Sequence, residues 1–320
     1  MINYPVPNII LSSCLEHEFC RYDGNMISSE IICILKPFVN FITVCPEVEI
    51  GLGIPRDTIT LIDSNNDSTF IQPATNKNLT TQMMQFSMDF ANNHTALDGI
   101  LLKSKSPSCG ITDAKIYRGL QQSILRNGSG LFAHQLVQAN PHVPAEDEKR
   151  LTNAKIRTIY FTRIFILARF RTMQISTMAE LIQFQSNNKL LFMTFSQKHL
   201  RELGKIAANH LKYSVAKVIH EYRQSFYQLL LRSPRYTSHL NTLDHAFGYF
   251  SHYLTSAEKK HYGQLKQYYR THKIDLSPLL LLMQSWIERF DIEYLRQQSY
   301  FYPYPPELMG CPDSDKGHVQ

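Results

Sequence analysis

Three cysteines in the first half of the chain, Cys14, Cys45 and Cys109, could together hold a metal. Any one of them alone would more often be a small buried side chain than a ligand. Three thiolates with no obvious fourth ligand suggest either an iron–sulfur cluster with one open iron or a zinc ion with an open position. Ligation by sulfur alone favours the iron–sulfur cluster, but the spacing of the cysteines is compatible with both.

A carboxylate lies beside the second of these cysteines. Glu47 comes shortly after Cys45, in a segment where Gly51 and Gly53 permit close approach of the backbone. Such a carboxylate can act as a general base, and Glu49 is a second candidate for this role. The alternative is structural, because Glu47 could instead accept hydrogen bonds from backbone N–H groups in the glycine-rich turn.

Hydroxyl and ammonium groups surround the third cysteine. Ser106 and Ser108 lie just before Cys109, and Lys103 and Lys105 lie close by in the same segment. Because a nearby positive charge favours the thiolate, the two lysines are expected to lower the pKa of Cys109. The thiolate is the form of cysteine that binds a metal.

The other three cysteines are not expected to be ligands. Cys33 lies on the apolar side of a predicted helix and is interpreted as a core residue. Cys20 and Cys311 have polar or proline-rich surroundings and are interpreted as bystanders. The first dozen residues lack the features of a secretory signal, so we expect a cytoplasmic protein without a disulfide framework.

Each candidate ligand follows a predicted strand, at residues 8–12, 41–44 and 99–103. Helical patterns at 28–39 and 79–93 lie between these strands. The alternation predicts an α/β fold with a mostly parallel sheet in this half of the chain. Ligands of such sheets bind beyond the carboxyl ends of the strands, where all three cysteines fall, so the cysteines could converge on one site.

The two halves of the chain differ in charge and in aromatic content. Residues 1–150 carry 11 Lys and Arg against 15 Asp and Glu, a net charge of −4, whereas residues 151–320 carry 22 against 12, a net charge of +10. Only 3 of the 17 tyrosines come before residue 151. Together with a length of 320 residues, this asymmetry predicts two modules with different partners.

Helical patterns dominate the second half. The segment 146–172 is interpreted as a helix that closes the first domain, and Thr177 with Glu180 forms a capping-box pattern at the start of the next helix. Further helices are predicted at 214–231, 238–254, 257–270 and 278–300. We therefore expect an α/β domain at 1–172, an all-α domain at 173–310 and a tail at 311–320.

Four separated motifs of the first half resemble the thiouracil desulfidase family over most of residues 8–170. They are Ser12-Ser13-Cys14-Leu15, Arg21-Tyr22-Asp23-Gly24, the run from Cys45-Pro46-Glu47-Val48 to Gly53-Ile54-Pro55-Arg56, and Lys103-Ser104-Lys105-Ser106-Pro107-Ser108-Cys109-Gly110. One departure is Leu15-Glu16-His17, where the family usually has Leu-Leu-Gly. We interpret Arg21 and Asp23 as an ion pair that braces the first loop.

This resemblance implies a [4Fe-4S] cluster held by Cys14, Cys45 and Cys109, with the fourth iron free to bind the sulfur of a thiocarbonyl base. It further implies that Glu47 activates water and that the loop with Ser106 and Ser108 positions the base or relays a proton. Of the two serines, Ser106 is preferred, because its hydroxyl is expected outside the turn at Pro107. The reaction would be a hydrolytic cleavage that yields the oxo base and hydrogen sulfide.

Motifs of the second half resemble the YbgA-like helical domain over roughly residues 178–309. They are Phe192-Met193-Thr194-Phe195-Ser196 with Arg201-Glu202-Leu203-Gly204, His245-Ala246-Phe247-Gly248-Tyr249-Phe250, and Tyr302-Pro303-Tyr304-Pro305-Pro306-Glu307-Leu308. The pair of domains resembles fused desulfidases that act on 4-thiouridine in transfer RNA. The segment 259–273 interleaves lysine, arginine and histidine with tyrosine, which suits phosphates and unpaired bases, so transfer RNA is the expected partner.

Three functions therefore remain open on the sequence. The first is a desulfidase of 4-thiouridine in transfer RNA, and the second is a desulfidase of free thiouracil-type bases. The third is a nucleic-acid-binding protein whose cluster or zinc is structural or senses oxidants. No membrane association is expected, because no apolar run approaches the length of a membrane span, and the sequence gives no indication of the oligomeric state.

Overall fold

The computed structural model describes residues 3–64, 67–120 and 122–309. The predicted tail at 311–320, and with it Cys311, lies outside the described residues. Within the described ranges, no helix is long and apolar enough to cross a membrane.

Two compact units make up the chain. One comprises the residues up to Thr172 together with the described residues from Tyr304 onward, and the other comprises Met173–Pro303. The sequence assigns the segment after Tyr304 to the second domain, but this segment packs with the first unit. The ring of Tyr304 lies 5.7 Å from that of Phe161, and Leu308 is buried in the same apolar core.

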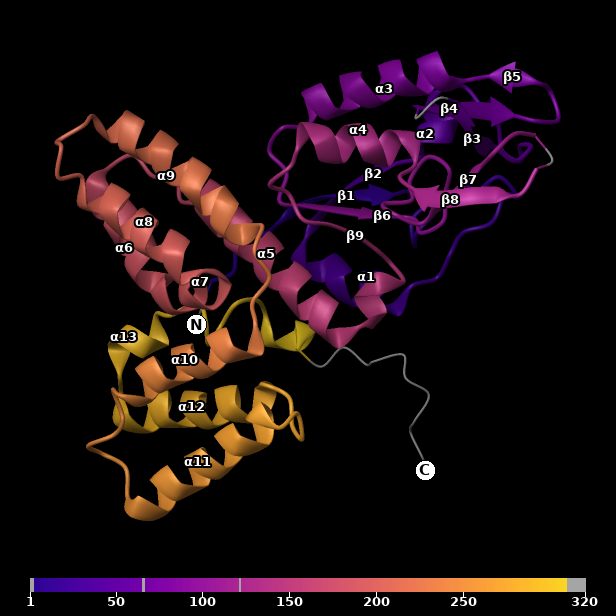
Figure 1. The fold of residues 1–320 in the computed structure, drawn as a ribbon. Coiled ribbons are helices and arrows are strands. Elements are labelled where there is room, and N and C mark those ends of the chain that lie inside the picture. Colours follow the sequence, from indigo (N-terminus) through magenta and orange to yellow (C-terminus); the bar gives the residue numbers. More distant parts are fainter. Residues whose placement is uncertain (1–2, 65–66, 121, 310–320) are drawn as a thin grey trace. The chain divides into compact units, whose positions relative to one another are not determined.

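A four-stranded parallel sheet forms the centre of the first unit (Figure 1). Its strand order is β2 (Asn40–Val44), β1 (Asn8–Ser12), β6 (Gly99–Leu102) and β9 (Ala145–Asp147), and every neighbouring pair is parallel. The two central strands are apolar along almost their whole length, as expected of strands covered on both faces. The predicted α/β fold with a mostly parallel sheet is confirmed.

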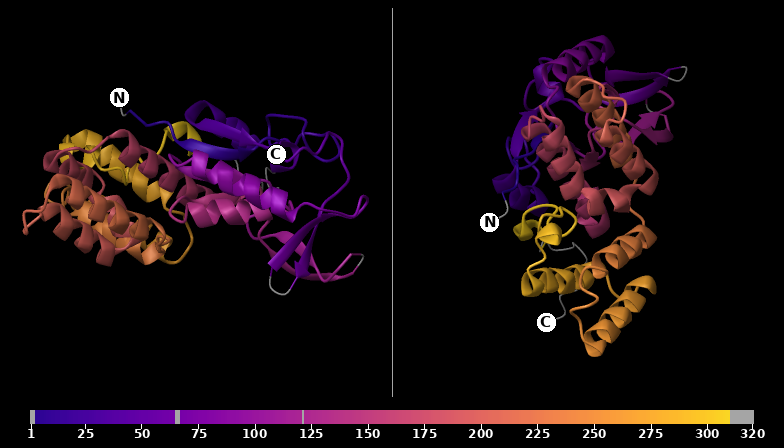
Figure 2. Two further views of the ribbon diagram at one scale, coloured as in Figure 1. Left: turned by 90° about the horizontal axis from the view of Figure 1, so that it is seen from above. Right: turned by 90° about the vertical axis from the view of Figure 1, so that its left-hand side faces the viewer.

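Helices cover both faces of this sheet (Figures 1 and 2). On one face lie α1 (Glu30–Leu35), its 3₁₀ extension η1 (Lys36–Phe38) and α5 (Ala154–Thr172); on the other lie α3 (Thr80–Asn93) and α4 (Leu131–Ala139). Successive strand side chains point to opposite faces, so each pair of helices packs on an alternate set of strand residues. The helices predicted at 28–39 and 79–93 are confirmed.

The helix predicted over 146–172 begins later than expected. Residues Ala145–Asp147 pair with β6 as the edge strand β9, and Arg150–Thr152 form the 3₁₀ helix η2. Only then does α5 begin, at Ala154. The charged residues that suggested a helix are thus used for strand pairing and for a turn.

A second, mixed sheet was not predicted from the sequence. Its strand order is β5 (Lys77–Asn78), β4 (Asp67–Gln72), β3 (Thr60–Ser64), β7 (Ala114–Tyr117) and β8 (Ile124–Gly128), and only the β3–β7 pair is parallel. Strand β8 is largely exposed and β5 is only two residues long. Such strands lack the apolar run or regular alternation by which a strand is recognised in a sequence.

Helices form the second unit throughout its described residues, which confirms the predicted all-α region. They are α6 (Met178–Asn187), α7 (Lys189–Phe195), α8 (Gln197–Ala208), α9 (Val215–Leu230), α10 (Tyr236–Phe247), α11 (Ser256–Arg270), α12 (Ser277–Phe290) and α13 (Glu293–Arg296). The capping box of Thr177 and Glu180 is present at the start of α6. The helix predicted at 278–300 is broken, because Asp291 adopts a left-handed conformation with φ of 52°.

Two short helical segments complete the first unit. The helix α2 (Pro46–Glu49) follows β2 directly, and the 3₁₀ helix η3 (Pro306–Leu308) lies in the segment that returns after the helical unit. Of these, α2 is the one that carries candidate site residues.

Candidate active site

The three candidate ligands lie beyond the carboxyl ends of three neighbouring strands. Cys14 follows β1, Cys45 follows β2, and Cys109 lies in the loop after β6. The register of the sheet pairs Ser12 with Val44, so Cys14 and Cys45 leave the sheet side by side. Cys109 is close enough to Cys45 for the two to interact electrostatically. The topology thus brings the three thiols into one region, with Cys109 buried and the other two partly exposed.

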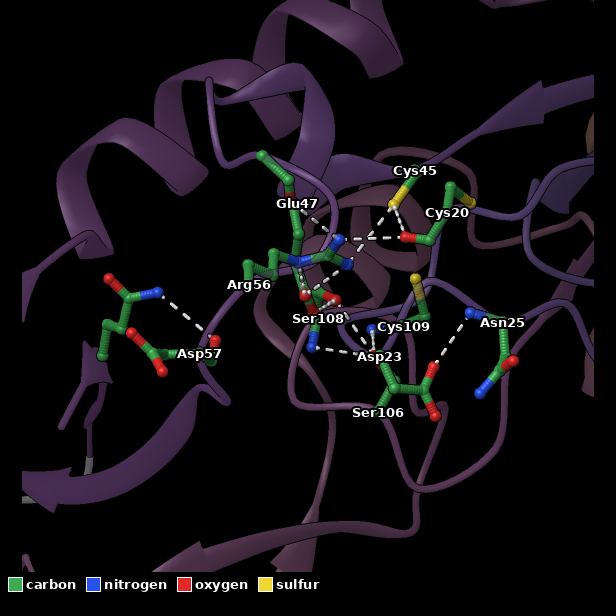
Figure 3. Close-up of polar contacts among 12 residues, drawn as sticks. Cys20, Asp23, Asn25, Cys45, Glu47, Arg56, Asp57, Ser106, Ser108 and Cys109 are labelled. Atoms are coloured by element: carbon green, nitrogen blue, oxygen red, sulfur yellow. Dashed lines mark hydrogen bonds and ion pairs between the residues drawn. The ribbon is translucent and has the colours of Figure 1, made fainter. Parts of the chain in front are cut away.

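A fourth cysteine belongs to the same group. Cys20 is only 2% exposed, and its thiol is near enough to those of Cys14 and Cys45 to interact with them electrostatically. Its backbone carbonyl accepts a hydrogen bond from the Cys45 thiol at 3.6 Å (Figure 3). The interpretation of Cys20 as a bystander is therefore wrong. Its position directly before the Arg21-Tyr22-Asp23-Gly24 motif was the available signal.

The structure places Cys33 on the surface, where its described partner is Glu16 rather than another cysteine. The helix α1 buries Ile31, Ile32 and Leu35, whereas Cys33 is exposed. The prediction that Cys33 is a core residue is wrong, because a helix that begins at Glu30 turns position 33 towards solvent.

Glu47 is the centre of a buried polar cluster. It lies on α2 and is 8% exposed. One carboxylate oxygen, Oε2, accepts hydrogen bonds from Nε and Nη2 of Arg56, both at 2.8 Å, and the other, Oε1, accepts one from the Ser108 hydroxyl at 2.7 Å (Figure 3). Side-chain donors therefore contact both oxygens of Glu47. The structural alternative instead proposed backbone N–H groups as the donors.

Arg56 connects this carboxylate to the thiols. Its Nη2 lies 3.7 Å from the Cys45 sulfur, and its Nη1 donates to the carbonyl oxygen of Cys20 at 2.9 Å. The guanidinium is almost fully buried, so its interactions with Glu47 and Cys45 are weakly screened by solvent. The sequence motif included Arg56, but reasoning from the sequence gave it no role.

The two serines of the loop have different surroundings. The Ser106 hydroxyl accepts hydrogen bonds from the backbone N–H groups of Ser108 at 3.3 Å and Cys109 at 3.1 Å, so it stabilises the turn. The Ser108 hydroxyl is buried, contacts Glu47 and lies 3.0 Å from the Ser106 hydroxyl. The reason for preferring Ser106 is wrong, because its hydroxyl lies inside the turn, and Ser108 is the serine that contacts the carboxylate.

Close packing against α4 holds this loop in place. The backbone of Leu131 donates to the carbonyl of Pro107 at 3.2 Å, and that of Ala133 donates to the carbonyl of Ser108 at 3.0 Å. A Cβ atom at Gly130 would lie 2.5 Å from the backbone of Ser108. Glycine is therefore required at the start of α4 for the loop to approach this closely.

The lysines near Cys109 do not favour its thiolate. Lys103 forms an ion pair with Glu148 at 2.8 Å and also contacts the carbonyl and hydroxyl of Ser104. Burial above all, with the charges of Cys45 and Glu47, raises the pKa of Cys109 to about 12. The hydrogen bond with Cys20, together with burial, raises the pKa of Cys45. The expectation of a lowered pKa for Cys109 is wrong, because burial of its thiol outweighs any effect of the nearby lysines.

The first loop keeps an ordered shape despite its unusual Leu15-Glu16-His17 sequence. Glu16 adopts a left-handed conformation with φ of 58°, and its carboxylate accepts a hydrogen bond from the backbone of Ser29. Arg21 and Asp23 form the expected ion pair at 3.3 Å. Both contacts hold the segment between Cys14 and Cys45 without taking part in the polar cluster around Glu47.

The donor set fits a cluster of several metal atoms. Among the residues that the structure describes, no three His, Cys, Asp or Glu side chains are arranged to hold one metal ion. In a [4Fe-4S] cluster each thiolate binds a different iron, so the ligands need not converge on one point. The soft sulfur atoms of Cys14, Cys45 and Cys109 are the ligands that iron–sulfur clusters require. Binding would release the protons that the raised pKa values keep on Cys45 and Cys109.

The first unit is an α/β unit with thiols and a buried carboxylate at the carboxyl edge of its sheet. Proteins of this class can bind a metal centre at that edge. Residues 9–148 match the family model described as 2-thiouracil desulfurase, and residues 189–305 match one described as a protein of unknown function, DUF1722. With its first unit, the chain belongs to the 2-thiouracil desulfurase family.

Two relatives have names without a described function. The "Uncharacterized protein YbbK" of Bacillus subtilis (strain 168) is 32% identical over 148 residues, which are 44% of this chain and 96% of that protein. The "Uncharacterized protein YbgA" of Escherichia coli (strain K12) is 28% identical over 130 residues, which are 40% of this chain and 77% of that protein. A solved structure, "[4Fe-4S]-dependent thiouracil desulfidase TudS", is 24% identical with a TM-score of 0.37, covering 45% of this chain and 93% of that one.

Proposed function

We propose that the protein is an iron–sulfur-dependent desulfidase that converts 4-thiouridine in transfer RNA to uridine. The reaction replaces a C=S bond by a C=O bond, consumes one water and releases one hydrogen sulfide. The observation that supports it best is the Glu47 carboxylate, held between Arg56 and Ser108 and linked through Arg56 to the sulfur of Cys45. This arrangement combines a general base with metal-binding thiols, as a hydrolytic desulfidase needs.

Cys14, Cys45 and Cys109 would hold a [4Fe-4S] cluster. When bound, such a cluster with one iron free of protein ligands supplies a Lewis acid and an acceptor for the substrate sulfur. The membership of residues 9–148 in the 2-thiouracil desulfurase family supports this cofactor together with the all-sulfur donor set.

Glu47 would activate the attacking water through Oε1. Two donors of Arg56 occupy Oε2 and fix the plane of the carboxylate, whereas Oε1 has only Ser108 as a partner among the described side chains. A carboxylate oxygen can accept more than one hydrogen bond, so Oε1 retains a lone pair for a water proton. The pair of hydroxyls at 3.0 Å, Ser108 followed by Ser106, offers a path along which that proton could move away.

The helical unit supports a polynucleotide substrate. The side chains of Lys259, Lys260 and His261 on α11 are exposed, and the exposed ring of Tyr268 has the Lys273 ammonium 5.8 Å from its centre. Exposed cations can neutralise phosphates, and an exposed ring can stack on an unpaired base.

Part of the interleaved pattern on this helix has a different explanation. Tyr262 and Tyr269 are buried, and Tyr262 stacks on Phe247 with 4.4 Å between the ring centres. Lys266 forms an ion pair with Asp244. These three residues of the segment therefore stabilise the helical unit, and the proposed RNA surface comprises Lys259, Lys260, His261, Tyr268, Arg270, His272 and Lys273.

A free thio-base is the second candidate substrate. It is favoured by the description of the matching family, which refers to the base 2-thiouracil rather than to RNA. In that case the cysteines and Glu47 would act in the same way, and the basic surface of the helical unit would serve another purpose.

Nucleoside analysis of thiolated transfer RNA, incubated with protein purified without oxygen, tests the proposal. We expect loss of 4-thiouridine with equal amounts of uridine and sulfide, and no reaction with Cys109→Ala. Cys33→Ala is the matched control, because Cys33 is exposed and lies outside the thiol group, and it should react normally. Turnover of free 4-thiouracil alone would favour the second candidate, and wild-type protein without iron or activity would refute both.

A further inference from the structure

Two exposed tyrosine rings lie on neighbouring helices of the helical unit. Tyr236 is the first residue of α10 and is 46% exposed, and Tyr268 lies in the last turn of α11 and is 45% exposed. The ring of His272, just after α11, connects the two helices: its centre lies 5.3 Å from that of the Tyr236 ring, with an angle of 69° between the ring planes. The first turn of α10 and the end of α11 therefore meet at one end of the helical unit (Figure 1).

The backbone at the end of α11 holds the His272 ring in this position. The N–H of His272 donates to the carbonyl of Tyr269 at 3.1 Å, and that of Lys273 donates to the carbonyl of Tyr268 at 2.9 Å, a pair of hydrogen bonds that closes many helices. His272 occupies the left-handed position of this motif, with φ of 57°. Glycine takes this position with the least strain, so what His272 adds is its side chain and not a better helix end.

Cations accompany these rings on both helices. The Lys273 ammonium lies 5.8 Å from the centre of the Tyr268 ring, and Arg235 directly precedes Tyr236. Arg235 and Lys273 are exposed, and neither forms an ion pair with another residue of the part of the chain that the structure describes. Both side chains are therefore available to a negatively charged partner.

The surface around the rings is positively charged. Residues 232–236 and 268–275 carry four Lys and Arg against one Asp, whose carboxylate accepts a hydrogen bond from the backbone N–H of Ser277 at 3.0 Å. Rings alone would suit an apolar protein surface, whereas exposed cations beside the rings suit a polyanion that also presents flat apolar faces. A single-stranded nucleotide of RNA has both features, since its phosphates are negatively charged and its base stacks on aromatic rings.

We propose that Tyr236, Tyr268 and His272 form a subsite that stacks a single-stranded base of the RNA substrate, with Arg235 and Lys273 binding the flanking phosphates. The inference rests on the proposed action on transfer RNA and names the part of the RNA that the helical unit holds. Stacking on a ring needs no particular base, so the subsite contributes affinity for an unpaired segment rather than sequence specificity. The two residues at the start of α10 join this surface through the contact between helices, because they lie outside the interleaved segment of α11.

Binding of an oligonucleotide of about eight uridines to the full-length protein tests the subsite, because this RNA has no paired segment. The same oligonucleotide with abasic riboses is the matched ligand, since it keeps the phosphates and lacks the bases. We expect the wild type to bind the uridine oligonucleotide more tightly. Tyr236→Ala should weaken that binding by about 10-fold, leave binding of the abasic oligonucleotide within about two-fold, and leave the slope of log affinity against log salt unchanged.

Three further variants separate stacking from other effects. Tyr236→Phe keeps the ring and should bind as the wild type does. His272→Gly removes the ring from a position that favours glycine, so it should weaken binding of the uridine oligonucleotide without lowering the free energy of unfolding. Tyr249→Ala is the control for an exposed ring elsewhere in the unit: Tyr249 is 43% exposed, stacks on Tyr294 with 5.2 Å between the ring centres, and has the exposed Glu293 next to that partner, so its loss should leave RNA affinity unchanged.

Three results would overturn the inference: equal affinity of the wild type for both oligonucleotides, equal affinity of Tyr236→Ala and wild type, or an equal loss in Tyr249→Ala. If Tyr236→Ala does not fold, His272→Gly decides, because unchanged binding in that variant would also overturn the inference. Desulfidation of thiolated transfer RNA, measured in parallel, separates this inference from the proposed function. A wild type that removes sulfur while Tyr236→Ala binds normally refutes only the subsite, and one that binds the uridine oligonucleotide without removing sulfur refutes only the proposed reaction.

Discussion

Arg56, Glu47 and Ser108 form a chain of charge-assisted hydrogen bonds that leads to the sulfur of Cys45. The contacts of 2.7–2.8 Å at the carboxylate are short, as expected when donor or acceptor is ionised. Such contacts restrict the carboxylate to one orientation, and a general base needs this orientation before the substrate arrives.

The first prediction concerns this carboxylate. Glu47→Gln keeps the shape of the side chain but removes the base, so turnover should fall by about 10²–10⁴-fold, the usual contribution of a general base. Steady-state kinetics with thiolated transfer RNA measures this, and iron content serves as the control. A variant that retains iron and full activity would mean that another group activates water.

The second prediction separates the two serines. Ser108→Ala removes a hydrogen bond to a charged acceptor and should lower turnover by about 10- to 100-fold, as the loss of about 1.5–3 kcal/mol implies. Ser106→Ala should instead weaken the turn, lowering the free energy of unfolding by about 1 kcal/mol with activity within a few-fold of wild type. Steady-state kinetics and denaturant unfolding of both variants test this prediction. If Ser106→Ala lowered turnover more than Ser108→Ala, the proton relay would be assigned to Ser106.

Strands and helices hold the residues of the candidate site in place because their backbones lie close together. The strands β1 and β2 deliver Cys14 and Cys45 side by side, and the N-terminus of α4 holds the loop that carries Ser108 and Cys109. The geometry of the site therefore depends on the spacing between a helix and a loop as much as on the candidate side chains.

Replacement of a single glycine should show this dependence. In Gly130→Ala the new Cβ would meet the backbone of Ser108 at 2.5 Å, so the loop or α4 must move. We expect an unfolding free energy lower by about 1–3 kcal/mol, as in other overpacked sites, with reduced iron binding. Gly263→Ala is the matched control: nothing lies within 4 Å of its added Cβ on α11, and it should be neutral or stabilising. Equal effects in both variants would contradict the packing argument.

In the helical unit, His239 of α10 predicts a dependence of stability on pH. Burial lowers the pKa of His239 from its ordinary 6.5 to about 4, and its ring stacks on Tyr300 at 5.9 Å. Between these pH values the unfolded chain binds the proton and the folded chain does not. This contribution to the free energy of unfolding is therefore complete above pH 6.5 and is lost as the pH falls towards 4, by about 3 kcal/mol at most.

Trp286 provides the measurement for this prediction. It is the one tryptophan of the sequence and is buried in the helical unit, so its fluorescence follows the unfolding of that unit. Denaturant unfolding of the wild type at pH 7 and pH 5 should show the loss, and His239→Phe should reduce it because the ring can still stack. A wild type equally stable at both pH values would contradict the assignment of a neutral buried histidine.

The whole molecule combines a first unit that is nearly neutral with a helical unit that is basic. The first unit carries 17 Lys and Arg against 18 Asp and Glu, whereas the helical unit, residues 173–303, carries 16 against 9, a net charge of +7. The net charge of residues 151–320 is +10, and the exposed cations on α11 are part of it. A basic surface attracts a polynucleotide largely through the release of counterions, so its effect must depend on salt.

Charge reversal on α11 tests whether this basic surface binds transfer RNA. Lys259→Glu with Lys260→Glu should weaken transfer RNA binding and lower the slope of log affinity against log salt by about one for each phosphate that is no longer neutralised. Lys77→Glu, an exposed lysine of the first unit, is the control for charge alone and should have a smaller effect. Turnover of free 4-thiouracil should be unchanged in the double variant. Unaltered RNA affinity would assign the RNA surface elsewhere.

The sequence by itself determined the parallel sheet, most of the helices and the three cysteines at the carboxyl ends of the strands. These features follow from local apolar patterns and from the rule that parallel strands end at one edge. It also determined the capping box at Thr177, which depends on neighbouring residues, and the asymmetry in charge, which depends on composition.

Only the tertiary structure decided which side chains meet. Contacts between segments far apart in the chain bring Cys20 and Arg56 into the site and place Ser108, rather than Ser106, against Glu47. Cys33 is exposed because of the point at which its own helix begins. The mixed sheet likewise arose from pairing of short strands without a clear pattern of their own. Sequence patterns record which residues are buried along one element, whereas the partner of a buried polar group is set by the packing of several elements together.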